Sequence, residues 1–246
     1  MSQDAPIGVV FDFDGTLTPK EYGSVIKVVE HACLPEPLKA RVGKLREEYL
    51  KMAALGAVDP AMERKLIVES LCVYVECGLS HVEWSTALDS VKLREGAAEK
   101  IKELSGRGIK VGIISFGVAD FIERVLERYG LGGIVQRIYA AQLIYDRPIG
   151  KIVDWNSRSV VHPFDKCLWS AVFARQYGIA PERLLAIGDS TGDRLLGFEK
   201  GLRLGIAEDA EEAKRISPYM GETVVTEHFS PVGNWIDRQI SLILNG

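Results

Sequence analysis

The sequence predicts an α/β fold in which helices cover a mainly parallel sheet and a helical subdomain interrupts the core. Two observations carry this prediction. Short apolar runs alternate with helical patterns along most of the chain, whereas residues 19–92 contain helical patterns but no convincing strand. With 246 residues, of which 47% are hydrophobic and 26% charged, the chain can bury a core without disulfides or a structural metal. Extended disorder is excluded as its main state.

The strands are expected at short, nearly continuous apolar runs, because a strand of a parallel sheet is buried on both faces. The first run, at residues 7–11, ends abruptly in Asp12-Phe13-Asp14-Gly15-Thr16. The later runs lie at 110–115, 138–143, 184–188 and 202–207. Helical patterns with Gly or Pro near their ends separate the runs, at 97–105, 118–129, 165–177 and 191–200.

Residues 19–92 break this alternation. Pro35, Pro37, Gly56, Asp59, Pro60 and Gly78 divide them into four helix-like stretches, which are expected at 22–32, 36–54, 60–76 and 80–91. A helical block that interrupts the first β–α–β crossover is best explained as an insertion. We therefore expect a helical subdomain at 19–92 and an α/β core made of 1–18 and 93–246. The acidic run at 208–214 is expected to be a solvated helix face.

Charge and cysteine content narrow the class of protein. The net charge of −4 gives no electrostatic reason to expect nucleic acid, and no run approaches the ~18 apolar residues of a membrane span. Residues 1–6 carry no Lys or Arg and lead directly into the first apolar run, so no signal peptide and a cytoplasmic location are expected. The cysteines lack zinc or redox spacing and are expected to be reduced, buried or half-buried thiols: Cys33, Cys72, Cys77 and Cys167.

Carboxylates follow two of the predicted strands. Asp12 and Asp14 come directly after the first strand, and Asp189 and Asp193 follow the run at 184–188. Open α/β sheets bind ligands at the carboxyl ends of their strands. Each pair alone has a simpler explanation, as an Asp-Gly turn or a helix cap. Together they would repel one another and raise each other's pKa unless a cation neutralised them, so Mg²⁺ with a substrate phosphate is expected here.

Two further residues fit a phosphate site. Ser115 ends the second predicted strand in Ile113-Ile114-Ser115-Phe116-Gly117, where it offers a hydroxyl and loop amides to a phosphoryl oxygen. Lys166 begins a predicted helix and could supply the positive charge that phosphate needs. Each residue alone is more often structural than functional. The order of a carboxylate pair, Ser, Lys and Gly-Asp, each at a strand end or helix start, makes the set specific.

With these four segments the sequence resembles the haloacid dehalogenase superfamily over its whole length. Asp12-Phe13-Asp14-Gly15-Thr16 is similar to the first motif of that superfamily, Ser115 to the second, Lys166 to the third, and Gly188-Asp189 with Asp193 to the fourth. The resemblance implies a Rossmann-like three-layer core and a helical cap of the C1 type, inserted after the first motif. This agrees with the helical block found from the pattern alone.

The resemblance also implies chemical roles for the carboxylates. Asp12 would be the nucleophile and form an aspartyl-phosphate. Asp14 would protonate the leaving oxygen and then activate water, which requires a pKa different from that of Asp12. Mg²⁺ would be bound by the Asp12 carboxylate, the main-chain carbonyl of Asp14 and Asp189, with Asp193 as a ligand or close partner.

The same resemblance assigns the substrate phosphate to Ser115, Lys166 and the amides near Gly117, which would hold the oxygens where charge accumulates in the transition state. A carboxylate at Asp14 together with the Gly188-Asp189 motif disfavours the dehalogenase and transport-ATPase branches. The segments at 92–96, 115–117, 161–166 and 188–193 are similar to pyrimidine 5′-nucleotidases and, more loosely, to phosphoserine phosphatases.

The expected function is a Mg²⁺-dependent phosphomonoesterase that hydrolyses a small phosphorylated metabolite, such as a nucleotide or a phosphoserine-like compound. A phosphotransferase or phosphosugar mutase with the same nucleophile is the first alternative. A phosphate-binding protein without turnover is the second. The protein is expected to be a monomer or homodimer, with no nucleic-acid or membrane partner.

Overall fold

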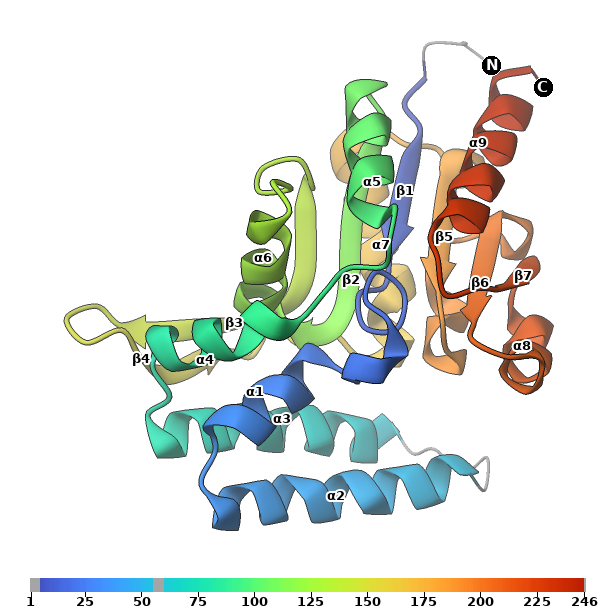
Figure 1. Ribbon diagram of the computed structural model, residues 1–246. Helices are drawn as coiled ribbons and strands as arrows, with labels where there is room; N and C mark the ends of the chain where they lie inside the picture. Colours follow the sequence, from blue (N-terminus) through green and yellow to red (C-terminus); the bar gives the residue numbers. More distant parts are fainter. Residues whose placement is uncertain (1–4, 55–59, 246) are drawn as a thin grey trace.

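A seven-stranded sheet in the order β4-β3-β2-β1-β5-β6-β7 forms the centre of the protein (Figure 1). The computed structural model describes residues 5–54 and 60–245. Neighbouring strands run parallel except β3 and β4, which pair antiparallel. The strands are β1 (Gly8–Phe11), β2 (Lys110–Val118), β3 (Arg137–Asp146), β4 (Lys151–Asn156), β5 (Leu184–Gly188), β6 (Arg203–Ala207) and β7 (Glu222–Val225). The predicted α/β class with a mainly parallel sheet is confirmed.

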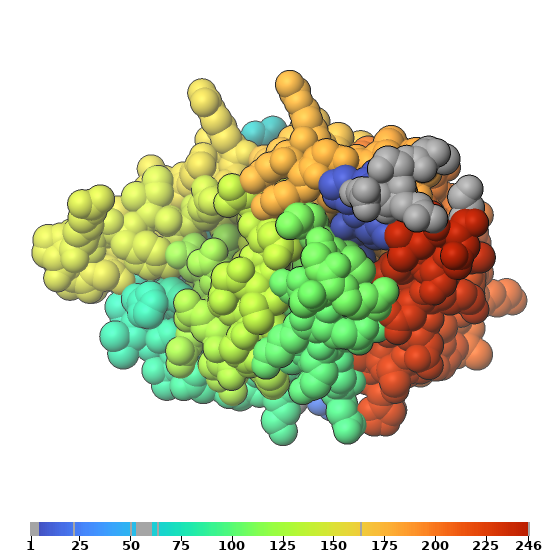
Figure 2. Space-filling view, turned by 90° about the horizontal axis from the view of Figure 1, so that it is seen from above, coloured from blue at the N-terminus to red at the C-terminus, as the bar shows by residue number. Residues whose placement is uncertain are grey.

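Helices cover both faces of this sheet because β1 and its neighbours are apolar on both sides. Val9 and Phe11 belong to the core under α5, α6 and α9, whereas Val10 belongs to the core under α7. Viewed from the end that carries the termini, α5 and α9 lie side by side, and the β3–β4 hairpin projects from one edge (Figure 2). The covering helices are α5 (Ala97–Gly106), α6 (Ala119–Arg128), α7 (Lys166–Tyr177), α8 (Ala210–Ile216) and α9 (Ser230–Asn245).

Four more helices lie beyond the carboxyl ends of the strands, at the end of the molecule opposite to the termini (Figure 1). They are α1 (Val25–Cys33), α2 (Glu36–Ala54), α3 (Pro60–Cys77) and α4 (His81–Ala87). Two of them are capped locally: in α1 the Ser24 hydroxyl accepts the N–H of Lys27, and at α4 Ser80 forms a reciprocal capping box with Glu83. The four stretches expected from the helical pattern match four helices, and their ends agree within four residues.

Several expected elements differ from the structure. Strands β4 and β7 and helix α9 are present in the structure but are not expected from the sequence. The helix expected at 191–200 is a short 3₁₀ helix, Thr191–Leu195, because the Asp193 side chain binds the preceding loop and Gly197 turns the chain with a φ of 71°. Strand β2 does not end at Ser115 but continues to Val118, with irregular pairing to β3 after Ile114.

Of the cysteines, Cys33, Cys72 and Cys77 are half-buried, as predicted. The prediction is wrong for Cys167, which is exposed at the start of α7. The helix break expected at Gly56 and Asp59 lies outside the described residues, as do residues 1–4 of the segment considered for a signal peptide. None of the helices within 5–54 and 60–245 is long and apolar enough to cross a membrane.

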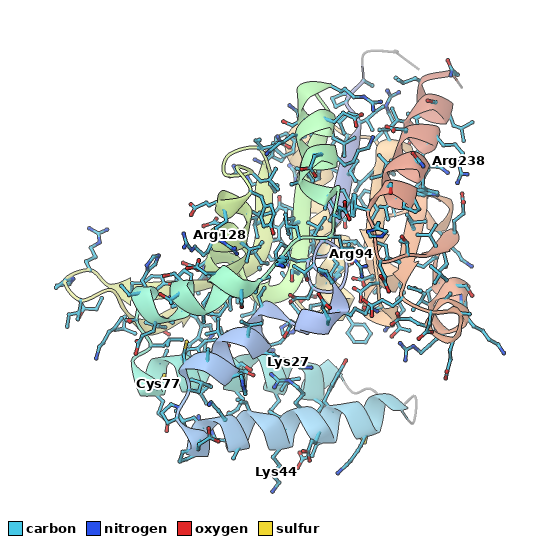
Figure 3. The ribbon with its side chains drawn as sticks, in the orientation of Figure 1. Lys27, Lys44, Cys77, Arg94, Arg128 and Arg238 are labelled. Atoms are coloured by element: carbon cyan, nitrogen blue, oxygen red, sulfur yellow. The ribbon has the colours of Figure 1, made fainter. Side chains whose placement is uncertain are left out.

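Arg94 ties together the two points where the chain passes between the sheet and helices α1–α4. It lies beside the loop that follows β1 (Figure 3). Its main-chain N–H donates to the carbonyl of Leu17 at 2.8 Å, and its buried guanidinium donates to the carbonyl of Gly15 at 2.8 Å. The guanidinium also donates to the carbonyls of Thr226 and Glu227, at 3.1 and 3.2 Å. One side chain thus satisfies carbonyls from two distant loops.

We expect Arg94→Met to lower the free energy of unfolding by about 3 kcal/mol, because it leaves partly buried carbonyls without a donor while keeping most of the side-chain volume. Urea denaturation followed by circular dichroism measures the loss. Arg158→Met, at an exposed arginine, is the control and should change stability by less than about 0.5 kcal/mol. Equal stability of the two variants would show that the Arg94 contacts contribute nothing net.

Candidate active site

The loop after β1 brings its carboxylates to the end of β5. The N–H of Asp12 continues the sheet by donating to the carbonyl of Ile187 at 2.9 Å, and the chain then turns tightly around the carbonyl of Phe13. Gly15 has a φ of 79°, and a Cβ at this position would lie 2.4 Å from Oδ2 of Asp189. Only glycine permits both this conformation and this close approach.

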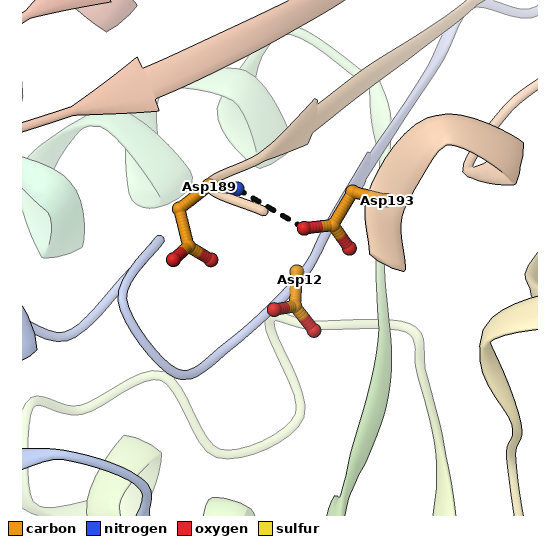
Figure 4. Close-up of side chains that lie close together, drawn as sticks. All are labelled: Asp12, Asp189 and Asp193. Carbon is orange, nitrogen blue, oxygen red and sulfur yellow. Dashed lines mark hydrogen bonds between the residues drawn. The ribbon is translucent and has the colours of Figure 1, made fainter. Parts of the chain in front are cut away.

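Asp12, Asp189 and Asp193 form a buried cluster, in which one ligand atom from each lies within 4.8 Å of the others (Figure 4). Asp193 is already saturated by protein donors. Its Oδ2 accepts the N–H groups of Asp189 and Ser190, at 3.1 and 3.0 Å, and its Oδ1 lies 2.5 Å from the ammonium of Lys166. Asp12 and Asp189 line a cavity, described below, whereas Asp193 does not, so these two carboxylates are better placed to face a ligand.

Lys166 provides the buried positive charge. Its Nζ lies 2.9 Å from Oδ1 of Asp12 and 4.2 Å from the ring centre of Phe116. The ammonium is fully buried. Burial acts to lower the pKa of Lys166, but Asp12 and Asp193 outweigh it and raise the pKa above its ordinary value. Lys166 therefore stays charged at neutral pH and neutralises part of the carboxylate cluster.

The remaining negative charge is not neutralised by the protein. Burial raises the pKa of Asp12 well above its ordinary value, although Lys166 opposes the shift. Burial likewise raises the pKa of Asp189, against the effect of Lys20, and raises the pKa of Asp14 to about 7. Crowded carboxylates with raised pKa values are what an added cation would relieve, and carboxylate oxygens are the ligands that Mg²⁺ prefers. The donor set therefore fits a divalent cation.

A cavity of about 250 Å³ opens between the strand ends and helices α1–α3. From the sheet side it is lined by Asp12, Asp14, Ser115, Gly117 and Asp189. The Ser115 hydroxyl accepts the N–H of Gly117 at 3.1 Å, and Oδ1 of Asp14 accepts the N–H of Val25 at 2.9 Å. The facing helices contribute Ser24, Ile26, Arg46, Tyr49, Leu66, Ile67 and Ser70.

The structure thus brings together every site residue expected from the sequence. Five of them line the cavity, while Lys166 and Asp193 lie fully buried beneath it. Their common position follows from the parallel sheet, because β1, β2 and β5 are adjacent and all end at the same edge.

Sequence reasoning missed four contributors. Thr16, inside the first motif, donates to Oδ1 of Asp189 at 3.1 Å, and Lys20 forms an ion pair with Oδ2 of Asp189 at 2.8 Å. The Lys20 ammonium also forms an ion pair with Glu212. The expectation of a solvated helix face at 208–214 is therefore wrong for Glu212, whose side chain is largely buried. Arg46 had no signal beyond its place on an amphipathic helix. Only Thr16 and Lys20, close to the carboxylate pair in sequence, could have been suspected.

Comparisons with known proteins agree with this geometry. The profile of the haloacid dehalogenase-like hydrolase family matches residues 9–197. A phosphoserine phosphatase of Archaeoglobus fulgidus is 28% identical over 204 residues, which are 83% of this chain and 53% of the relative. The chain thus spans about half the length of that protein. A phosphoserine phosphatase of Streptococcus thermophilus is 24% identical over 86% of this chain and 88% of its own length.

Solved structures share the fold. A phospho-aspartyl intermediate analogue of phosphoserine phosphatase has a TM-score of 0.68 at 19% identity and covers 94% of this chain and 99% of its own. Cytosolic 5′-nucleotidase IIIB bound to cytidine has a TM-score of 0.67 at 21% identity, over 96% of this chain and 87% of its own. Both likenesses extend over the helices beyond the strand ends as well as the sheet.

The raised pKa of Asp14 predicts how stability depends on pH in the metal-free protein. The folded state keeps this proton up to about pH 7, whereas the unfolded chain loses it near pH 4, so the free energy of unfolding falls as pH rises between these values. In Asp14→Asn this contribution is absent, while the amide oxygen can still accept the N–H of Val25.

We therefore expect Asp14→Asn to be more stable than the wild type by about 4 kcal/mol at pH 8 and nearly equal to it at pH 4. Urea denaturation in the presence of a chelator, repeated across this pH range, measures the difference. Glu182→Gln, at an exposed carboxylate, should follow the wild-type profile. Parallel profiles for Asp14→Asn and the wild type would contradict the raised pKa.

Proposed function

The chain belongs to the haloacid dehalogenase-like hydrolase family, and we propose that it is a Mg²⁺-dependent phosphomonoesterase acting on a small phosphorylated metabolite. One observation carries the proposal. The Asp12 carboxylate stands at the end of the central strand, 2.9 Å from a buried ammonium, and opens together with Asp14 into a cavity closed by helices α1–α3. This is the arrangement that a nucleophilic carboxylate and its proton donor need.

Within this proposal, residues 19–92 are a cap and residues 1–18 with 93–246 are the catalytic core. The position of α1–α4 over the carboxyl ends of the strands supports this division. So does the contribution of Ile26, Arg46 and Ile67 to the cavity wall opposite Asp12. A cap in this position excludes water from the phosphoryl group and contacts the rest of the substrate.

In the first step an oxygen of Asp12 attacks phosphorus, the bond from phosphorus to the leaving oxygen breaks, and Asp14 donates a proton to that oxygen. An aspartyl-phosphate and a free alcohol result. The N–H of Val25 holds Oδ1 of Asp14, which leaves Oδ2 near Gly117 and free to donate. Splitting one displacement into two in this way lowers the barrier to each.

Ser115, Lys166 and the N–H groups near Gly117 would bind the oxygens of the phosphoryl group. Lys166 contributes a fixed charge that needs no reorganisation when charge develops. Asp12, the main-chain carbonyl of Asp14 and Asp189 would hold Mg²⁺, which neutralises the phosphoryl group when bound. Asp193 does not line the cavity, so it would orient Lys166 and the loop of Asp189 instead of binding the cation directly.

In the second step water attacks the phosphorus of the aspartyl-phosphate, and the bond between phosphorus and Asp12 breaks. Asp14, now a carboxylate, takes a proton from the water, so phosphate leaves and both residues return to their starting states. If a second hydroxyl replaced water, the protein would be a phosphotransferase or mutase. The transfer of phosphate to water is favoured here because the relatives compared are named as phosphatases.

The cavity favours a small leaving group. About 250 Å³ is below the usual range of ~300–1,000 Å³ for sites that take drug-sized ligands. Its cap side carries one ion pair, in which Arg46 lies 2.6 Å from the buried carboxylate of Glu30, and Ser70 donates to the same carboxylate at 2.8 Å. A phosphoserine-like compound therefore fits better than a nucleotide. The cytoplasmic location and the monomeric or dimeric state stay predictions.

Asp12→Asn should remove turnover without unfolding the protein, because an amide cannot attack phosphorus but can still accept the ammonium of Lys166. We expect a loss of kcat of at least about 10³-fold, measured as phosphate release from an aryl phosphate with Mg²⁺ present. Circular dichroism confirms the fold, and Glu182→Gln should keep wild-type kcat. A folded Asp12→Asn variant within tenfold of wild type would contradict the mechanism, and unchanged wild-type release in chelator would contradict the metal.

Substrate preference is tested by comparing kcat/KM for O-phosphoserine, glycerol phosphates and nucleoside monophosphates. We expect the small esters to exceed the nucleotides by at least about tenfold, because the cavity of about 250 Å³ is small. The reverse order would contradict the assignment of the substrate class while leaving the phosphatase mechanism intact. Consumption of ester without equal release of phosphate, in the presence of added alcohols, would identify a phosphotransferase.

A further inference from the structure

Lys20 contacts both the side chain and the main-chain carbonyl of Asp189, a carboxylate of the proposed metal site. Its Nζ lies 2.8 Å from Oδ2 of Asp189 and donates to the main-chain carbonyl of the same residue at 3.2 Å. The same ammonium forms an ion pair with Glu212 of α8. The exposed fractions of the three side chains are 23% for Lys20, 9% for Asp189 and 13% for Glu212, so solvent screens these contacts only partly.

The carboxylate of Glu212 is held in place by hydrogen bonds that do not involve Lys20. Oε2 of Glu212 accepts the N–H of Glu208 at 3.0 Å, and the N–H of Glu212 donates to the capping carboxylate of Asp209 at 2.8 Å. Glu208 in turn accepts the main-chain N–H of Lys20 at 3.0 Å. The loop between β6 and α8 therefore positions both the backbone and the side chain of Lys20.

Asp189 does not depend on Lys20 alone for its orientation. The Thr16 hydroxyl donates to Oδ1 of Asp189 at 3.1 Å, on the other oxygen of the carboxylate. Removal of the ammonium would leave this hydrogen bond in place. The distinctive contribution of Lys20 is therefore its positive charge, placed on an oxygen of a residue that would hold a cation.

We propose that Lys20 is a positioning residue that sets the divalent-cation affinity of the site, with its ammonium shared between Asp189 and Glu212. The proposal rests on the metal site of the proposed function. The ammonium on Asp189 repels a cation bound to the same carboxylate, and Glu212 draws the ammonium away from it. Lys20 thus compensates the crowded carboxylates while the cation is absent and weakens their hold on it when present.

The two partners of Lys20 give opposite expectations. Lys20→Gln removes the repulsion, so Mg²⁺ should bind more tightly, by at least about fivefold in dissociation constant. Glu212→Gln leaves the ammonium with Asp189 as its one carboxylate partner in this triad, so Mg²⁺ should bind more weakly, by at least about threefold. The double variant, in which charge is conserved, should fall between the single variants. If Lys20 served only to hold Asp189 and Glu212 in place, either substitution would disrupt this arrangement, and both would shift the Mg²⁺ affinity in the same direction.

The experiment titrates the metal-free full-length protein with Mg²⁺ alone by isothermal calorimetry, without substrate. Lys214→Gln, which removes one positive charge from an exposed position of α8, is the matched control and should stay within twofold of wild type. Lys20→Arg keeps the charge and should also remain within about threefold, which covers the case in which Lys20→Gln fails to fold. Urea denaturation monitors the fold of each variant.

Shifts of the same sign in Lys20→Gln and Glu212→Gln, or no shift in either, would overturn the proposal. If Lys20→Gln is not folded, tighter binding by Lys20→Arg or unchanged binding by Glu212→Gln would overturn it. The wild-type titration separates this failure from that of the proposed function. Absence of Mg²⁺ binding to the wild type would overturn the metal site and the role of Lys20 together, whereas Mg²⁺ binding with shifts of equal sign would overturn only the latter.

Discussion

The ion pair of Lys166 with Asp12 and Asp193 is the interaction on which the rest of the site depends. All three side chains are buried, and none could stay charged there without the others, because an unpaired buried charge costs several kcal/mol. Lys166 fixes the position of Asp12 at the end of β1. It also binds Asp193, whose other oxygen accepts the N–H of Asp189 and so fixes the loop that carries this residue. The strand ends β1 and β5 and the start of α7 are therefore held as one unit around a single ammonium.

A net negative charge remains after this pairing, and it gives the site its chemistry. Lys166 and Lys20 together face more carboxylates than they can neutralise, and the pKa values of Asp12, Asp14 and Asp189 are raised as a result of burial. In the proposed site an added divalent cation would relieve this crowding, and Lys166 with the N–H groups near Gly117 would face the phosphate.

Closure over this site depends on the two passages of the chain between the sheet and helices α1–α4. Arg94 joins them by donating to Leu17 and Gly15, and Glu208 accepts from both Arg94 and the main chain of Lys20. The residues that hold the helices over the strand ends therefore also touch the loop that carries Asp14. Placement of the cavity wall and placement of the reacting groups are mechanically linked.

The α/β class, five of the strands and the four carboxylates follow from the sequence alone, because β1, β2, β5 and β6 are buried and nearly continuously apolar, and polar residues begin where β1 and β5 end. The sequence did not reveal β4 and β7, whose residues are largely exposed and lack that pattern, nor α9, whose first turn contains Pro231 and Gly233. The contacts of Lys20, Arg94 and Glu212 form only in the tertiary structure. Lys20 meets Asp189 and Glu212 across 169 and 192 residues of chain, and no local pattern encodes a contact between charges so far apart in sequence.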